Sequence, residues 1–111
     1  MQTDFNYLIM LYSFYGTLLS DNKKRYFELY YHEDFSLGEI AEEFAISRQA
    51  VRDSLLKAEQ ALKNYEEKLH LFTQAESRKQ ELQAVLNSLT TGNSEESIRL
   101  LQKMLDHIDK E

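Results

Sequence analysis

The chain contains almost nothing that would interrupt an α-helix. Its 111 residues include no proline and only three glycines. Leu, Glu, Lys, Gln and Ala, which all favour helix, make up much of the rest. No β-branched run long enough for a strand occurs, and a hydrophobic content of 42% is enough for a packed core. We therefore predict an all-α protein built as one small domain with an extension.

Composition also argues against several functional classes. There is no cysteine, so a disulfide framework or a thiolate metal site cannot form. The three histidines lie in three separate segments, and no glycine-rich phosphate loop or nucleophile beside a polar pocket is evident. We expect no enzyme activity, no metal and no cofactor. The apolar N-terminus lacks a basic start and is too short to span a bilayer, so we expect a cytoplasmic protein.

Capping residues and apolar periodicity divide the chain into helices. Apolar side chains at spacings of three and four predict a first helix within residues 5–19. Ser20 is a predicted N-cap for a second helix that ends near His32. Ser36 and Glu39 have the spacing of a capping box for a third helix, 37–44. Ser47 is placed to cap a fourth helix that begins at Arg48.

Beyond Arg48 the apolar pattern is that of a long helix with a heptad seam. From Val51 to Phe72 the apolar residues alternate spacings of four and three for roughly three heptads. The seam lapses over residues 73–81 and resumes at Leu82, and an unbroken helix to Leu89 would be ~60 Å long. A turn with Gly92 in the left-handed conformation, followed by a helix capped by Ser94, would complete a C-terminal hairpin or dimerisation unit. Periodicity leaves open whether the seam faces its own chain or another.

Residues 36–55, SLGEIAEEFAISRQAVRDSL, have the pattern of a helix-turn-helix. Ala41 supplies the small residue where two helices touch, and apolar residues at 40, 44, 46 and 51 would face inward. The second helix then begins with polar residues, which in such units meet the major groove. The predicted nucleic-acid-binding residues are Arg48, Gln49, Arg52, Asp53 and Lys57.

The distribution of charge complicates this interpretation. The chain carries 13 Lys+Arg against 19 Asp+Glu, for a net charge of −6. Residues 48–64 hold four basic and two acidic groups, net +2, whereas residues 34–47 hold four acidic groups and no basic one. Phosphate neutralisation supplies much of the affinity for nucleic acid, so tight binding by a single copy is not expected. An alternative is a protein–protein adaptor that meets a basic partner through Glu39, Glu42 and Glu43, with the helix-turn-helix as a scaffold.

Four motifs together resemble the YlxM family of small bacterial helix-turn-helix proteins. They are ELYY at Glu28–Tyr31, SLGEIAEEF at Ser36–Phe44, ISRQAV at Ile46–Val51 and YEEKL at Tyr65–Leu69, within a similarity that covers residues 14–71. The helix-turn-helix is also similar to region 4 of sigma factors, which reads the −35 promoter element. In two places the chain departs from these patterns. Ala45 stands where such turns often use Gly or Asn, and Arg52 stands where the family would have Tyr.

The resemblance implies a regulatory or accessory role in the signal recognition particle pathway, because genes of the family neighbour the gene for the particle's GTPase. Implied partners are the particle's RNA, its protein subunit, or DNA. The family carries no catalytic residue. A DNA-binding transcription regulator acting alone is the least favoured alternative because of the net charge.

Taken together, the patterns predict a helical domain over residues 1–64 and an extension over residues 65–111. The extension is expected to mediate self-association, and a homodimer is the expected state. The wide apolar face of the first helix and the heptad seam both exceed what one small chain covers.

Overall fold

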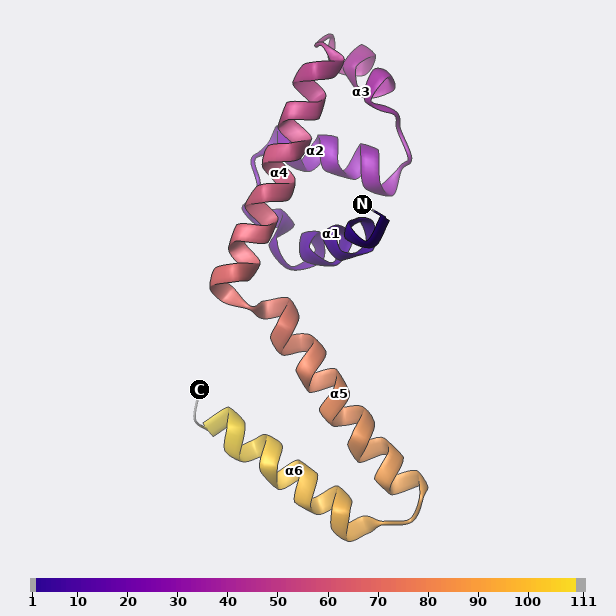
Figure 1. Ribbon diagram of the computed structural model, residues 1–111, viewed down its shortest axis with the longest axis vertical. Coiled ribbons are helices and arrows are strands. Elements are labelled where there is room, and N and C mark those ends of the chain that lie inside the picture. The colour runs from indigo at the N-terminus through magenta and orange to yellow at the C-terminus, as the bar shows by residue number, and fades with distance from the viewer. Residues whose placement is uncertain (1, 110–111) are drawn as a thin grey trace. The chain divides into compact units, whose positions relative to one another are not determined.

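A computed structural model describes the backbone of residues 2–109 and the side chains from residue 5 onward (Figure 1). Every regular element in this part of the chain is a helix, which confirms the predicted all-α class. The elements are α1 (Gln2–Tyr15), a 3₁₀ turn (Gly16–Leu18), α2 (Asp21–Phe27), a π-helical segment (Glu28–His32), α3 (Leu37–Phe44), α4 (Arg48–Leu69), α5 (Leu71–Thr90) and α6 (Ser94–Asp109). The chain divides into two units, Met1–Phe72 and Thr73–Glu111.

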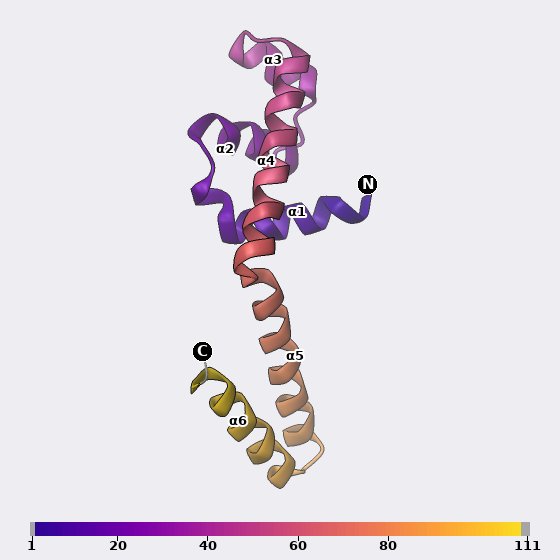
Figure 2. The same cartoon turned by 60° about the vertical axis from the view of Figure 1, so that its left-hand side comes forward.

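In the first unit, α4 is the central element. Helices α1, α2 and α3 each pack against it, as two views of the ribbon show (Figure 2). The apolar residues of α4 recur at spacings of three and four, so that one face of the helix is buried along its length. The largest fully buried side chains come from all four helices and are Leu11, Tyr15, Phe27, Ile40, Val51 and Leu62.

Local capping fixes where the helices of the first unit begin. The Ser20 hydroxyl accepts the Lys23 N–H, which confirms Ser20 as the N-cap of α2. In the capping box, the Ser36 hydroxyl accepts the Glu39 N–H at 3.0 Å and the Glu39 carboxylate accepts the Ser36 N–H at 2.9 Å. The Ser47 hydroxyl accepts the Ala50 N–H at 3.0 Å and caps α4. All three predicted caps are confirmed.

The turn between α3 and α4 depends on a left-handed alanine. Ala45 has φ 56° and ψ 44°. The N–H of Ile46 reaches back to the carbonyl of Ala41 at 3.0 Å, and that of Ala45 to the carbonyl of Glu42 at 3.3 Å. This is the Schellman pattern, in which glycine is the usual left-handed residue. The departure seen in the sequence is therefore accommodated by a Cβ held in an unfavourable backbone conformation.

The long helix expected from Arg48 onward is interrupted, so this prediction was wrong. Helix α4 ends at Leu69, His70 adopts the left-handed conformation with φ 56°, and α5 begins at Leu71. The first two N–H groups of α5 need partners, and α1 and α4 provide them. Leu71 donates to the Tyr15 hydroxyl and Phe72 donates to the Glu66 carboxylate, each at 3.0 Å.

Tyr15 and Glu66 form a buried pair beneath this break. The Tyr15 hydroxyl donates to Glu66 Oε1 at 2.6 Å, and both side chains are buried. Burial, with the adjacent Glu66 carboxylate as the next cause, raises the pKa of Tyr15 above its ordinary value. The neutral phenol is thus the form that fits the folded state.

The second unit is a helical hairpin made by α5 and α6. Gly92, with φ 80°, makes the left-handed turn that was predicted. The cap of α6 is Asn93, whose side-chain oxygen accepts the Glu96 N–H at 3.1 Å, and not Ser94 as the sequence suggested. Ser88 and Ser97 are buried between the two helices and share a hydrogen bond of 2.5 Å.

We predict that Ala45→Gly stabilises the protein. Glycine reaches the left-handed region without the Cβ penalty, so the free energy of unfolding should rise by about 1 kcal/mol. Urea denaturation monitored by circular dichroism would measure the change. Ala50→Gly, at an exposed position inside α4, is the matched control and should lower the free energy by about 0.5–1 kcal/mol. A destabilising Ala45→Gly would mean that the turn does not need a left-handed residue.

We predict that stability falls as the pH rises past about 10, the ordinary value for tyrosine. A raised folded-state pKa contributes stability that is present below the unfolded value and is lost as the pH climbs through the folded value. Tyr15→Phe should flatten part of this alkaline loss. At pH 7 it should also destabilise the protein by about 1–3 kcal/mol, because it removes a donor from buried Glu66.

Tyr30→Phe serves as the control for this experiment, because the Tyr30 hydroxyl makes no hydrogen bond within residues 5–109. Thermal unfolding between pH 7 and pH 11 would compare the variants. Equal alkaline slopes in the wild type and in Tyr15→Phe would contradict the role given to Tyr15.

Candidate nucleic-acid interface

Helices α3 and α4 meet through small and apolar side chains. Ala41 is buried where the two helices touch, as expected, and Ile40 and Val51 are fully buried beside it. Phe44 packs its ring edge-on against Tyr26 at 5.0 Å between centroids. Ile46 differs from the prediction, since it lies at the turn with 37% of its surface exposed instead of facing inward. These contacts hold the first turns of α4 in a fixed position relative to α3.

The first two turns of α4 expose a polar row. A recognition helix must expose its first turns in order to contact base edges. All four of the predicted residues in these turns are exposed, namely Arg48, Gln49, Arg52 and Asp53. Their spacings of one, three and four residues place them on one side of the helix, because each residue turns the helix by about 100°. The structure therefore brings together four of the five predicted residues. Lys57 is also exposed and lies one turn beyond Asp53, toward the edge of this row.

Leu56 extends the row and was missed from the sequence. It follows Arg52 by four residues and is 49% exposed. The only sequence signal was that Leu56 lies outside the heptad seam, which passes through Leu55 and Ala58. An exposed aliphatic side chain beside Arg and Gln can contact a thymine methyl group or a sugar. We define the recognition row as Arg48, Gln49, Arg52, Asp53 and Leu56.

The guanidinium of Arg48 lies against the first turn of α3. A Cβ added at Gly38 would come 3.0 Å from the Cζ, Nε and Nη2 atoms of Arg48. A side chain at position 38 would therefore displace the guanidinium. Gly38 thus gives Arg48 a resting position across the two helices, with its charge at the edge of the recognition row.

Within the row, Gln49 and Asp53 are paired with each other. The Gln49 amide donates to Asp53 Oδ1 at 2.9 Å across one turn of the helix. This hydrogen bond orients the amide, and it also occupies a donor that could otherwise bind adenine. Arg52 makes no hydrogen bond or ion pair within residues 5–109. Arg48 and Arg52 are accordingly the cations in the row best placed to meet phosphate or guanine.

The acidic residues proposed for a protein partner gather on α3. Glu39, Glu42 and Glu43 are exposed and, with Phe35, line an open hollow of about 430 Å³. Glu39 is already engaged in the capping box, and the backbone N–H of Ser36, followed by its side chain, lowers the pKa of the Glu39 carboxyl. Glu42 and Glu43 are therefore the acids in the hollow with the greater freedom to bind a cation.

Two further kinds of site were searched for in the part of the chain that the structure describes. The described side chains, those of residues 5–109, contain no cluster of three or more His, Cys, Asp or Glu that could hold a metal ion. In the same range, no helix is both long enough and apolar enough to cross a bilayer.

Comparison with known proteins agrees with this geometry. Residues 2–105 match the family described as "Putative helix-turn-helix protein, YlxM / p13 like". The chain is 50% identical over 86 residues to the UPF0122 protein YofM of Lactococcus lactis, covering 78% of each chain. It is 42% identical over 107 residues to the UPF0122 protein YlxM of Bacillus subtilis, covering 96% of this chain and 94% of that one. A UPF0122 protein of Desulforamulus reducens is 44% identical over 100 residues, covering 90% and 86%. The chain therefore belongs to the YlxM / p13-like family of helix-turn-helix proteins.

Proposed function

We propose that the protein binds nucleic acid through the recognition row and acts without catalysis, as a regulatory or accessory protein. The observation that carries this proposal is the exposure of Arg48 and Arg52 on a helix-turn-helix whose two helices meet through buried Ile40, Ala41 and Val51. The packed α3–α4 contact holds the row in place, so that ordering its backbone adds no cost on binding.

Phosphate contacts would supply most of the affinity and base contacts the selectivity. Arg48 and Arg52 would contact phosphate oxygens or guanine, while Leu56 would pack on a methyl group or sugar. Asp53 lies within the row and would repel phosphate, and the acids of α3 add negative charge to the helix-turn-helix. The expected result is moderate, strongly salt-dependent binding by each copy.

The active form in this proposal is a homodimer. One copy presents two exposed cations in its recognition row, which is few for a nucleic-acid-binding protein. Pairing two copies lets a second weak contact form at high effective concentration, so overall affinity rises without any new residue.

The proposed setting is the signal recognition particle pathway, with the particle's RNA as the first candidate ligand. This setting rests on the family resemblance. The similarity to region 4 of sigma factors keeps a DNA duplex as the second candidate, and selection of a palindromic site would favour a transcription regulator.

We predict that Arg48→Ala/Arg52→Ala lowers nucleic-acid affinity at least tenfold while the helical fold is retained. Each arginine contact to guanine or phosphate contributes about 1–3 kcal/mol, and removing both should also reduce the salt slope by about 2. Fluorescence anisotropy with labelled particle RNA, an unrelated RNA and a random DNA duplex, each across a salt series, would measure both quantities.

Arg25→Ala/Lys68→Ala is the matched control, because it removes two exposed cations that lie outside the recognition row. Its affinity should stay within about threefold of the wild type, since distant exposed charges are screened at moderate salt. Equal losses in both double variants would show that net charge, and not the row, governs binding. Wild-type binding to particle RNA alone at moderate salt would identify the ligand.

A second candidate function is favoured by the hollow on α3. If the wild type bound none of the three nucleic acids even at low salt, the protein would act as an adaptor for a basic protein surface. The particle's protein subunit is the partner implied by the resemblance. Glu42→Lys/Glu43→Lys would then abolish binding to that subunit in a pull-down, whereas Glu76→Lys/Glu95→Lys, which reverses two acids elsewhere, would not.

A further inference from the structure

The hairpin of the second unit exposes two rows of aliphatic side chains. On α5 the row is Leu82, Leu86 and Leu89, and on α6 it is Ile98, Leu101, Leu105 and Ile108. These seven side chains are 43–62% exposed. Their spacings of four and three on α5, and of three, four and three on α6, are those of helix-packing seams. We refer to the seven residues as the hairpin face.

Both rows lie on the same side of the hairpin. On α5 the row is centred about 100° around the helix from Val85 and Ser88, which face α6. On α6 the row is centred about 60° around from Ser97, in the same rotational sense along the chain. Because the two helices run antiparallel (Figure 1), rotations of the same sense bring both rows to one face of the hairpin.

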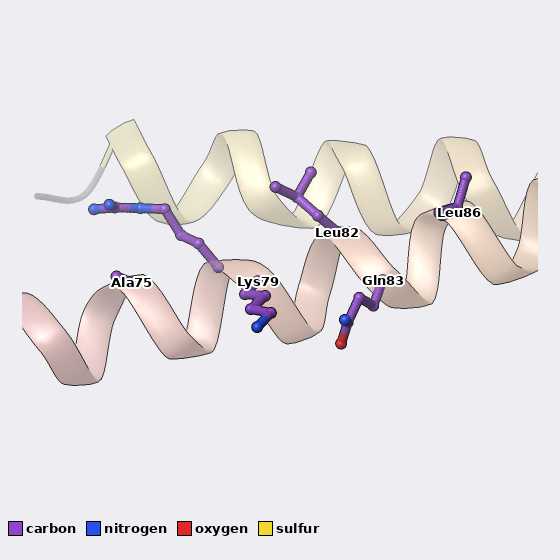
Figure 3. A pocket seen from close by; sticks show the side chains of 6 residues that line it. Ala75, Lys79, Leu82, Gln83 and Leu86 are labelled. Carbon is purple, nitrogen blue, oxygen red and sulfur yellow. The ribbon is translucent and has the colours of Figure 1, made fainter. Parts of the chain in front are cut away.

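A close view of α5 shows how the apolar side chains lie relative to the polar ones. In this view Leu82 and Leu86 point upward, while Lys79 and Gln83 point downward (Figure 3). These residues border an open hollow of about 410 Å³ along the helix surface. A hollow between successive turns is the kind of space that receives a side chain from a facing helix.

The hairpin has almost no apolar core of its own. Among its described residues, Val85 is the single buried apolar side chain, and Leu100 and Met104 are only half-buried. The small polar residues Ser88 and Ser97 are buried at the contact between the helices. Units of about 40 residues rarely fold without a disulfide, a metal or association, and this chain has no cysteine. The hydrophobic residues that would stabilise the hairpin are the ones it exposes.

The size of the hairpin face suits a pair of identical surfaces. Its seven side chains expose roughly 600 Å² of apolar surface, so two copies would bury roughly 1,200 Å², at the lower end of the range for stable interfaces. A monomer rarely leaves so large an apolar patch in water. If the hairpin needs a partner in order to fold, that partner must be present wherever the chain is synthesised. A second copy of the same chain meets this condition.

We propose that the hairpin faces of two copies pack together into a four-helix bundle, and that folding of the hairpin is coupled to this pairing. The inference gives the homodimer of the proposed function its interface, and it rests on that proposal. An isologous pairing buries both rows of both copies at once. The first unit, with its own core, remains folded whether or not the hairpins are paired.

We predict that Leu101→Lys/Leu105→Lys converts the dimer to a monomer. Four lysines placed in one bundle core should weaken self-association by at least about a hundredfold. In sedimentation equilibrium the wild type should show twice the 13.1 kDa mass of one chain, and the variant the mass of one chain. Gln80→Lys/Asn87→Lys adds the same charge on exposed positions of α5 outside the hairpin face, and should remain dimeric.

Circular dichroism distinguishes loss of pairing from general unfolding. All seven tyrosines lie between residues 7 and 65, so the near-ultraviolet signal reports on the first unit alone. The lysine variant should keep this signal and lose far-ultraviolet helicity from the hairpin. Dilution of the wild type should cause the same partial loss of helicity.

Single-cysteine variants supply a test that does not depend on disruption. The chain has no cysteine, so Leu86→Cys and Gln80→Cys each carry one thiol. A short thiol cross-linker should join two copies of Leu86→Cys at least tenfold more efficiently than two copies of Gln80→Cys.

The outcomes separate this inference from the proposals beneath it. If the wild type is monomeric at every concentration, both the proposed homodimer and its interface are wrong. If that monomer still binds nucleic acid, the proposed role of the recognition row is retained. A lysine variant that stays dimeric would overturn the hairpin interface and keep the homodimer. Full helicity in a monomeric variant would overturn the coupling of folding to pairing.

Discussion

The hydrogen bond between Tyr15 and Glu66 joins elements that are far apart in the sequence, and much of the first unit depends on it. It buries a carboxylate beneath α1 and α4, and the same two side chains then accept the first N–H groups of α5. A buried carboxylate with a single missing donor would be strongly destabilising. The pair therefore determines both the position of α1 on α4 and the point at which α4 ends and α5 begins.

Because α1, α2 and α3 cover one face of α4, its other face at the first two turns is left to solvent. The recognition row is a consequence of this packing, since a helix buried on one side must place its remaining residues outward. The same packing sets the first turn of α3 against Arg48, at one end of the row. A surface with both signs of charge binds weakly but discriminates among ligands, because a poorly aligned phosphate meets a carboxylate.

Features set by neighbouring residues could be predicted from the sequence, and features set by distant ones could not. The caps at Ser20, Ser36 and Ser47 and the left-handed Gly92 each depend on contacts within a few positions. The break at His70 was missed because nothing nearby requires it, and its caps come from Tyr15, 56 residues from Leu71, and from buried Glu66. Leu56 was not singled out from the sequence, because the exposure of an aliphatic side chain on α4 depends on which face α1, α2 and α3 cover.

The hairpin and the first unit differ in where their large apolar side chains lie. The first unit encloses its large apolar side chains, including Tyr15, Phe27 and Leu62, within one chain. The hairpin buries Ser88 and Ser97 between its helices and exposes most of its Leu and Ile side chains. Leucines in place of Ser88 and Ser97 would give the hairpin an apolar core of its own and would remove the reason for the pairing that we propose. With serine at these two positions, the apolar surface available for burial lies on the hairpin face. In the proposed homodimer, association would supply the second nucleic-acid contact that the recognition row of a single copy lacks.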